Sequence, residues 1–194
     1  MESLAYKDTT FFERRRKEIL DGKTVLMSPS PSTNHQIVVG NIHRLFSIFF
    51  KGKTCRAFVN GPDIHLTKKD IVLPDVFIVC NKDIIKWNGI YGAPDLVVEV
   101  LSPGTMKNDR GYKKDLYEKH GVKEYWLVDS YNLSIEVYLL ENNKYILNNT
   151  YMVHPDYMLE VMTEEEKSEI KYEFVTESFS DLTIPLDEVF EGIL

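Results

Sequence analysis

The chain has 194 residues, of which 43% are hydrophobic and 12% are aromatic, enough for one well-buried core and short for two domains. We therefore predict a single domain over residues 1–194. A net charge of −7 argues against a protein that coats nucleic acid non-specifically, because such proteins carry a broad basic surface. Local basic patches can still guide a phosphate backbone.

The first residues and the cysteines suggest the compartment. Residues 1–22 interleave charged with aromatic side chains and contain no apolar stretch of signal-peptide length, and later apolar runs such as VFIVC are strand-sized. We expect a soluble, cytoplasmic protein. Only two cysteines occur, and Cys80 ends an apolar run where a small hydrophobic residue is expected. We predict reduced thiols and no disulfide framework.

The N-terminal half begins with a predicted hairpin and a helix. Asp21-Gly22 lies between two short apolar segments and supplies the positive φ angles of a tight turn, so residues 17–27 are predicted to form a β-hairpin. The prolines of SPSPS at 28–32 lead into a helix over roughly 33–50, whose apolar residues recur at helical spacing. We expect Thr33 and Gln36 to form its capping box.

Four segments rich in β-branched and aromatic residues follow and are predicted to be strands: TCRAFVN, DIHLT, IVLPDVFIVC and PDLVVEVL. The runs VFIVC and LVVEVL are almost continuously apolar, which is typical of central strands covered on both faces. A helix is expected over residues 109–120, with Tyr112 and Leu116 on its buried stripe and Gly121 as its left-handed stop.

The remaining segments complete the predicted architecture. EYWLVD is expected to return as a strand, IEVYLL and KYILNN flank Glu-Asn-Asn as another hairpin, and residues 163–173 are charged enough for a solvated loop or short helix. This order predicts an α/β domain of the α+β type, in which helices pack on a mixed sheet with hairpins at its flanks.

Two acidic residues stand where hydrophobic residues are expected: Asp75 within IVLPDVFIVC and Glu99 within PDLVVEVL. A buried carboxylate is normally paired, hydrogen-bonded or bound to a metal, because leaving it unpaired costs on the order of several kcal/mol. A paired core carboxylate would explain one such residue. Two acids on neighbouring apolar strands repel each other unless a positive group lies between them, and a divalent cation such as Mg²⁺, which prefers oxygen ligands, is the economical explanation.

Other metal ligands have less support in the sequence. The histidines and cysteines show no spacing typical of a zinc site. Asp95 shares the alternating face of Glu99, but four residues along a strand span about 13 Å, too far for both to ligate one metal. We expect Asp95 to accept hydrogen bonds from backbone amides at the strand entry.

Pro74-Asp75 followed by Glu99 on the next long strand resembles the PD-(D/E)xK signature of the restriction-endonuclease-like nucleases, except that Leu101 stands where the signature has lysine. The longer strings are similar to the Uma-type family of bacterial restriction endonucleases over about residues 12–192: DGKTVLMSPSPSTNHQ, LPDVFIV, PDLVVEVLSPGTMKNDRGYKKDLYEKHGVKEYWLVD and LTIPLDEVF. The resemblance implies an αβββαβ core with flanking β-hairpins. It also implies a metal-dependent endonuclease that hydrolyses phosphodiester bonds in nucleic acid, above all DNA, with Mg²⁺ or Mn²⁺ as cofactor.

The resemblance also assigns roles to individual residues. Asp75, Glu99 and the backbone carbonyl of Val100 would hold the metal, and Lys113, on the helix after the strand, would replace the lysine absent at Leu101. An ordinary salt bridge to Asp109, four residues earlier, is the alternative explanation of Lys113. Lys114 is turned about 100° around the helix and should be more exposed.

His35 matches the family's SPSPxxHQ segment. It would either assist the substrate or metal-bound water, or be a hydrogen-bonded core histidine. Residues 105–123 carry six basic against three acidic side chains, and we expect Lys107, Arg110 and Lys114 to contact phosphates. The basic run is otherwise explained as a solvated helix face.

Two other functions stay open at this point. The chain could be a catalytically idle nuclease-fold binding or regulatory domain in a defence or mobile-element system, since a fold does not guarantee chemistry. It could also hydrolyse another phosphate ester with the same metal site. A homodimer would supply two active sites for cleavage of double strands.

Overall fold

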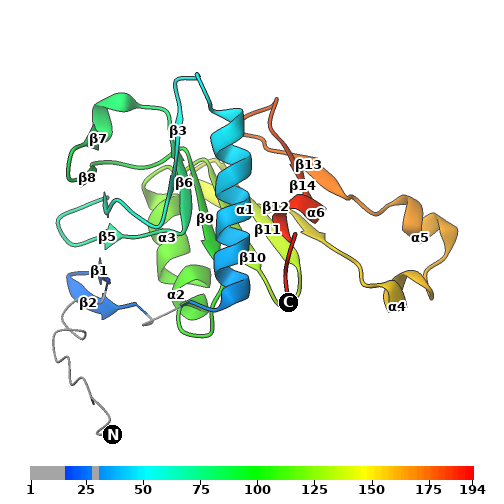
Figure 1. Ribbon diagram of the computed structural model, residues 1–194. Helices are drawn as coiled ribbons and strands as arrows, with labels where there is room; N and C mark the ends of the chain where they lie inside the picture. Colours follow the sequence, from blue (N-terminus) through cyan, green and yellow to red (C-terminus); the bar gives the residue numbers. More distant parts are fainter. Residues whose placement is uncertain (1–15, 28–30) are drawn as a thin grey trace, which may run out of the picture.

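The computed structural model describes residues 16–27 and 31–194 (Figure 1). Its strands are β1 (Lys17–Leu20), β2 (Lys23–Leu26), β3 (Arg56–Val59), β4 (Ile64–His65), β5 (Ile71–Val72), β6 (Val76–Val79), β7 (Ile85–Lys86), β8 (Gly89–Ile90), β9 (Leu96–Val100), β10 (Glu124–Asp129), β11 (Ser134–Glu141), β12 (Lys144–Met152), β13 (Glu173–Val175) and β14 (Thr183–Pro185). The helices are α1 (Thr33–Phe49), the 3-10 helix η2 (Lys82–Ile84), α2 (Met106–Arg110), α3 (Tyr112–Lys119), α4 (Asp156–Leu159), α5 (Glu164–Ser168) and α6 (Leu186–Val189). The fold is a mixed α/β fold, as predicted.

The strands of the described segments form two larger sheets. The central one has the order β12-β11-β10-β9-β6-β3, and in it only β9 and β10 are parallel. The smaller sheet has the order β2-β1-β5-β4-β8-β7. The predicted hairpins at 17–27 and after residue 130 are present as β1–β2 and β11–β12.

The central strands are buried on both faces, as their continuous apolar runs predict. Along β6 and β9, Val76 and Val98 pack in one core with α1, whereas Phe77 and Val97 pack in a second core with Leu116 of α3. Alternate side chains of a strand point to opposite faces, so α1 and α3 cover opposite faces of the sheet. Figure 1 shows α1 crossing in front of β6 and β9 with α3 behind them.

Several predicted boundaries are wrong for local reasons. The side chain of Ser32 caps α1 by accepting from the backbone amide of His35, so Thr33 and Gln36 do not form the capping box. The predicted strand over 71–80 is divided between the two sheets at Leu73 to Asp75, where proline cannot donate to a ladder. The helix predicted over 109–120 begins earlier and is interrupted at Gly111, although Gly121 ends it with φ of 80° as expected.

The expectation of two reduced thiols is also wrong for this structure. Cys55 and Cys80 form a disulfide with an S–S distance of 2.03 Å. The antiparallel register of β3 and β6 pairs Arg56 with Val79, so the two cysteines lie opposite each other just beyond that pair. The disulfide therefore joins neighbouring strands of the central sheet.

Two further features concern the helices. The segment that carries α4 and α5 lies between β12 and β13 and extends away from the sheets (Figure 1). Its charged run forms a short helix, which is one of the two structures predicted for residues 163–173.

Among the described residues, none of the helices has the length and apolarity needed to cross a membrane.

Candidate active site

The two unexplained acidic residues lie on neighbouring strands. Asp75 immediately precedes β6, Glu99 lies in β9, and the pairing of Val76 with Val98 places Asp75 beside Glu99 in the antiparallel register. The backbone amide of Val100 donates to Asp75 Oδ2 over 2.9 Å. Both carboxylates are buried, Glu99 with only 3% of its surface exposed. The sheet thus holds two carboxylates at one point of the protein interior.

Lys113 reaches the same point from α3. Its Nζ lies 2.6 Å from Glu99 Oε1 and 3.2 Å from Asp109 Oδ1, and the lysine is only 2% exposed. The salt bridge to Asp109 and a contact with Glu99 therefore exist together. Lys114 is more exposed than Lys113, as predicted, and its ammonium lies over the ring of Tyr138.

The expected buried stripe of this helix is wrong at one residue. Tyr112 is 39% exposed, and Lys113 takes the inward position beside Leu116 and Tyr117. The Tyr112 hydroxyl donates to Asp70 Oδ1 over 2.6 Å at the rim of the small sheet. The lysine is thus part of the buried stripe itself.

Glu18 and Tyr117 were not predicted to belong to the site, and Asp109 was predicted only as a salt-bridge partner of Lys113. Glu18 of β1 is buried and lies 3.1 Å from Lys113 Nζ, and its carboxylate accepts from the backbone amide of Leu73 over 2.9 Å. Asp109 is 1% exposed, and the Tyr117 hydroxyl donates to Glu99 Oε1 over 2.9 Å. One signal could have identified Glu18, because it shares the buried face of the predicted hairpin with Leu20.

His35 closes the site from the side of α1. Its Nε2 lies 3.3 Å from Asp75 Oδ2, and its Nδ1 is buried without a hydrogen-bond partner among the described residues. Burial alone would lower the pKa of His35, but the hydrogen bond and charge of Asp75, helped by the backbone of Val100, raise it above its ordinary value. His35 and Asp75 thus act as a coupled pair.

The site carries more negative than positive charge. Burial raises the pKa of Glu99 well above its ordinary value; Lys113 opposes this effect, and Asp109, Asp75 and Glu18 add to it. Burial likewise raises the pKa of Asp109 despite Lys113. Although burial opposes it, the charge of Glu99 and its neighbours raises the pKa of Lys113, so the ammonium stays charged. Lys113 contacts three of the four buried carboxylates and His35 contacts the fourth, so carboxylates outnumber the cationic groups and the cluster favours a further cation or proton.

The donor set fits a hard cation better than a zinc ion. No group of three histidine, cysteine or carboxylate side chains converges on a metal position within residues 16–27 and 31–194. Mg²⁺ needs fewer protein ligands, since it keeps several waters and is usually bound through one or two carboxylates. Asp75, Glu99 and the carbonyl of Val100 are oxygen donors of this kind, and the surplus negative charge around Lys113 suits a divalent ion.

The other sequence-predicted residues lie around this cluster. Asp95 accepts from the backbone amide of Cys80 over 2.8 Å and pairs with Lys123, the structural role expected for it. Lys107 is exposed on α2. Arg110 is ion-paired with Glu136 of β11 at 2.7 Å, so its guanidinium is already engaged by the protein.

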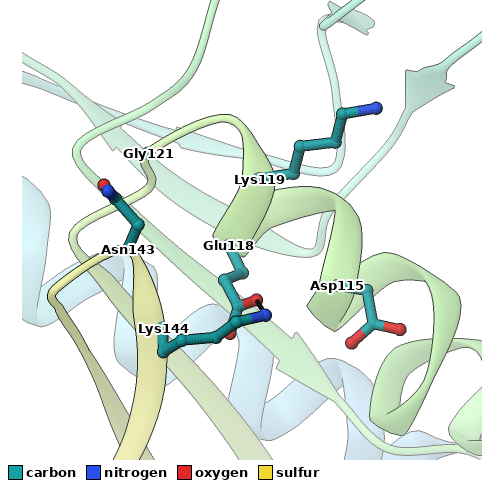
Figure 2. A pocket seen from close by; sticks show the side chains of 6 residues that line it. All are labelled: Asp115, Glu118, Lys119, Gly121, Asn143 and Lys144. Carbon is teal, nitrogen blue, oxygen red and sulfur yellow. Dashed lines mark hydrogen bonds and ion pairs between the residues drawn. The ribbon is translucent and has the colours of Figure 1, made fainter.

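A separate open pocket of about 590 Å³ lies between α3 and the start of β12 (Figure 2), lined by Asp115, Glu118, Lys119, Gly121, Asn143 and Lys144. Within it Glu118 pairs with Lys144 at 2.6 Å and accepts from the amide of Tyr145. None of the clustered carboxylates lines this pocket. The pocket therefore belongs to the outer side of α3.

Residues 3–174 match the model of the Uma2 family, which is described as a putative restriction endonuclease. The chain belongs to this family. The resemblance predicted from the sequence is thereby confirmed, although the matched region begins earlier and ends before LTIPLDEVF.

Two individual proteins extend the comparison. The chain is 31% identical over 128 residues to the uncharacterized protein slr1290 of Synechocystis sp., which covers 65% of this chain and 67% of that one. The fold of the present chain matches the crystal structure of a putative nuclease belonging to DUF820 from Anabaena variabilis, with a TM-score of 0.69. The two chains are 19% identical, and the match covers 93% of this chain and 92% of that one. At this identity the second likeness shows the fold. Family and fold together indicate a restriction-endonuclease-like nuclease.

Proposed function

We propose that this member of the Uma2 family is a metal-dependent endonuclease that hydrolyses phosphodiester bonds of nucleic acid, with DNA as its main substrate. The supporting observation is a buried ammonium, that of Lys113, in contact with three buried carboxylates, while a fourth, that of Asp75, lies on the strand beside Glu99. Asp75 and Glu99 stand at the strand positions where the PD-(D/E)xK pattern places acidic residues. A buried cluster with surplus negative charge is costly for folding, and active sites are where such a cost is tolerated.

Asp75, Glu99 and the carbonyl of Val100 would hold Mg²⁺ or Mn²⁺, which when bound supplies charge neutralisation at a phosphoryl oxygen and lowers the pKa of a coordinated water. Tyr117 and Lys113 orient the Glu99 carboxylate through Oε1. The Lys113 ammonium adds a positive charge beside Glu99, which would stabilise the negative charge that develops on the phosphoryl group during attack.

His35 has a second role in this scheme. The contact of its Nε2 with Asp75 Oδ2 fixes the ring, and Nδ1 has no hydrogen-bond partner among the described residues. A water hydrogen-bonded to Nδ1 would be oriented beside the carboxylates. The histidine thereby holds Asp75 in place and offers a site for a proton.

The test is incubation of the purified protein with single-stranded and double-stranded DNA and RNA, and with a small phosphodiester, in Mg²⁺, Mn²⁺ or EDTA. We expect metal-dependent cleavage of DNA that is lost in Asp75→Asn and preserved in Asp95→Asn, because the side chain of Asp95 binds the Cys80 amide and Lys123 within the described part of the chain. Cleavage of the small ester alone would place the activity in another class of phosphoesterase. Metal-independent cleavage, or equal rates in Asp75→Asn, would contradict the proposal.

A second candidate is a catalytically idle binding or regulatory domain. It is favoured by the fact that Glu99 Oε1 already accepts from both Lys113 and Tyr117, so a metal must compete with two partners for that oxygen. Divalent-metal binding that disappears in Asp75→Asn separates the candidates. Nucleic-acid binding without metal binding and without cleavage would support the idle domain.

A further inference from the structure

The hairpin formed by β7 and β8 presents an exposed tryptophan at its turn. Trp87 has 97% of its surface exposed, whereas Trp126, in the core, has none and packs edge-on against Phe46. An indole in water forgoes the large apolar burial that normally stabilises this residue. Trp87 therefore contributes little to the folded state, and its exposure requires another explanation.

Backbone and ring contacts with the residues around β4 hold the β7–β8 hairpin in place, with Trp87 exposed at its turn. The backbone amide of Ile90 donates to the Asp63 carbonyl over 2.8 Å, and Ile90 is fully buried. A Cβ at Gly89 would lie 2.9 Å from the same carbonyl, so only glycine permits this approach. The Tyr91 ring is stacked on His65 with 4.4 Å between the ring centroids. These contacts fix the strands on either side of the turn that carries Trp87.

The segment that carries Trp87 is basic, on a chain whose net charge is negative. From residue 82 to residue 87 its exposed charged side chains are those of Lys82 and Lys86 against Asp83. Lys82 and Lys86 belong to the same η2–β7 segment as the tryptophan. Cationic side chains around an exposed aromatic ring are the combination that binds the phosphates and bases of unpaired nucleic acid.

The sheet relates this hairpin to the carboxylate cluster. Glu18, which contacts Lys113, lies on β1, and β7 lies four strands away in the order β1-β5-β4-β8-β7. Strands are spaced by about 4.8 Å, so β7 lies roughly 19 Å from β1 across the sheet. At about 3.4 Å per nucleotide this is the length of roughly six nucleotides. Figure 1 shows β7 and β8 at one end of the small sheet, on the side opposite the α4–α5 segment.

We propose that Trp87 is a base-stacking contact for a nucleic-acid strand that extends from the cleavage position, with Lys82 and Lys86 on its phosphates. This inference rests on the proposed nuclease function and adds to it a place where the substrate strand is held. The indole stacks on an unpaired base, since a paired base within a duplex has both faces covered.

The test is binding of a fluorescein-labelled 20-nucleotide single-stranded DNA in EDTA, followed by anisotropy, with wild type, Trp87→Ala and the matched control Tyr157→Ala. Tyr157 is 71% exposed on α4, away from the small sheet. We expect Trp87→Ala to weaken binding by about 5-fold to 100-fold, the usual range for one stacked base, and Tyr157→Ala to bind as wild type. Unlabelled DNA should quench the tryptophan fluorescence of the wild type and leave Trp87→Ala, which retains only the buried Trp126, unquenched.

The outcomes separate this inference from the proposed function. Equal affinity of Trp87→Ala and wild type, or no quenching at saturation, would overturn the stacking role while metal-dependent cleavage stands. A wild type that binds no single-stranded DNA would also overturn the stacking role, whereas only the absence of metal-dependent cleavage would overturn the proposed function. Equal circular dichroism and melting temperature of Trp87→Ala and wild type show that the variant is folded, as expected for a side chain outside the core.

Discussion

The Lys113 ammonium, on helix α3, lies 2.6 Å from Glu99 Oε1 on strand β9. In the PD-(D/E)xK pattern the lysine that accompanies this carboxylate stands on the strand itself, two residues further along. That strand position is Leu101, which is 3% exposed and packs in the same core as Leu116. A leucine side chain fills the space at the strand, and the lysine approaches the carboxylate from α3 instead. Glu99 and Leu101, two residues apart along the strand, face the same side of the sheet.

Lys113→Gln should lower the single-turnover rate of DNA cleavage by about two orders of magnitude or more, the usual effect of removing one donor to developing negative charge. Lys114→Gln should cleave at nearly the wild-type rate, because Lys114 lies over the Tyr138 ring and not among the carboxylates. If Lys113→Gln kept full activity and Lys114→Gln lost it, the catalytic role would belong to Lys114 and the assignment to Lys113 would be wrong.

Burial also gives Lys113 a structural role. Removing the ammonium leaves Glu18, Glu99 and Asp109 without their shared cation, and breaking a buried ion pair commonly costs about 3–5 kcal/mol. A loss of activity in Lys113→Gln could therefore reflect lost stability as well as lost catalysis. Urea unfolding of each variant must precede the kinetic comparison.

Much of this site follows from the sequence, and the part that does not depends on tertiary contacts. Asp75 and Glu99 interrupt apolar runs, so their unusual position can be recognised from the sequence alone. Glu18 lies in a four-residue strand and meets Lys113, 95 positions later, only when the small sheet folds against α3. No local pattern contains that contact.

The helix face shows a second limit of sequence reasoning. A lysine is normally expected on the solvent side of a helix, so the sequence predicts Tyr112 in the inward position. The interruption at Gly111 starts α3 anew, and its inward stripe is Lys113, Leu116 and Tyr117. The charges of Glu18, Glu99 and Asp109 make the interior favourable for the ammonium, and helical periodicity alone cannot show this.

The His35–Asp75 pair should make stability depend on pH. The pKa of His35 is raised in the folded protein, so its contribution to the free energy of unfolding is fully present below the ordinary value of 6.5 and is lost as pH rises through the folded value. In urea titrations from pH 5 to 9, the stability difference between wild type and His35→Gln should be most in favour of wild type at low pH and should decline above about pH 6.5.

His43 provides the matched control, because burial lowers its pKa and the sign reverses. Wild type should lose stability relative to His43→Gln as pH falls below about 6.5. A stability difference for His35→Gln that is constant or grows with pH would contradict the assigned pairing with Asp75.

The disulfide between Cys55 and Cys80 closes a segment with a sequence separation of 25. Replacing both cysteines by serine should lower the free energy of unfolding by about 3.5 kcal/mol, the loop-entropy value for this length. Urea unfolding of the oxidised wild type and the double variant measures the difference. Alkylation of two thiols in native, unreduced protein, detected by intact mass, would show instead that the pair is open.

The most direct test of the metal site is calorimetric titration of Mg²⁺ and Mn²⁺ into wild type and Asp75→Asn. Asparagine keeps the size of the side chain and an oxygen that accepts from the Val100 amide, so the variant should fold while losing one charged ligand. We predict saturable binding of one divalent ion to wild type, a melting temperature that rises with metal concentration, and loss of both in Asp75→Asn. Equal binding by the two proteins, or no binding by wild type, would contradict a metal centre at Asp75 and Glu99.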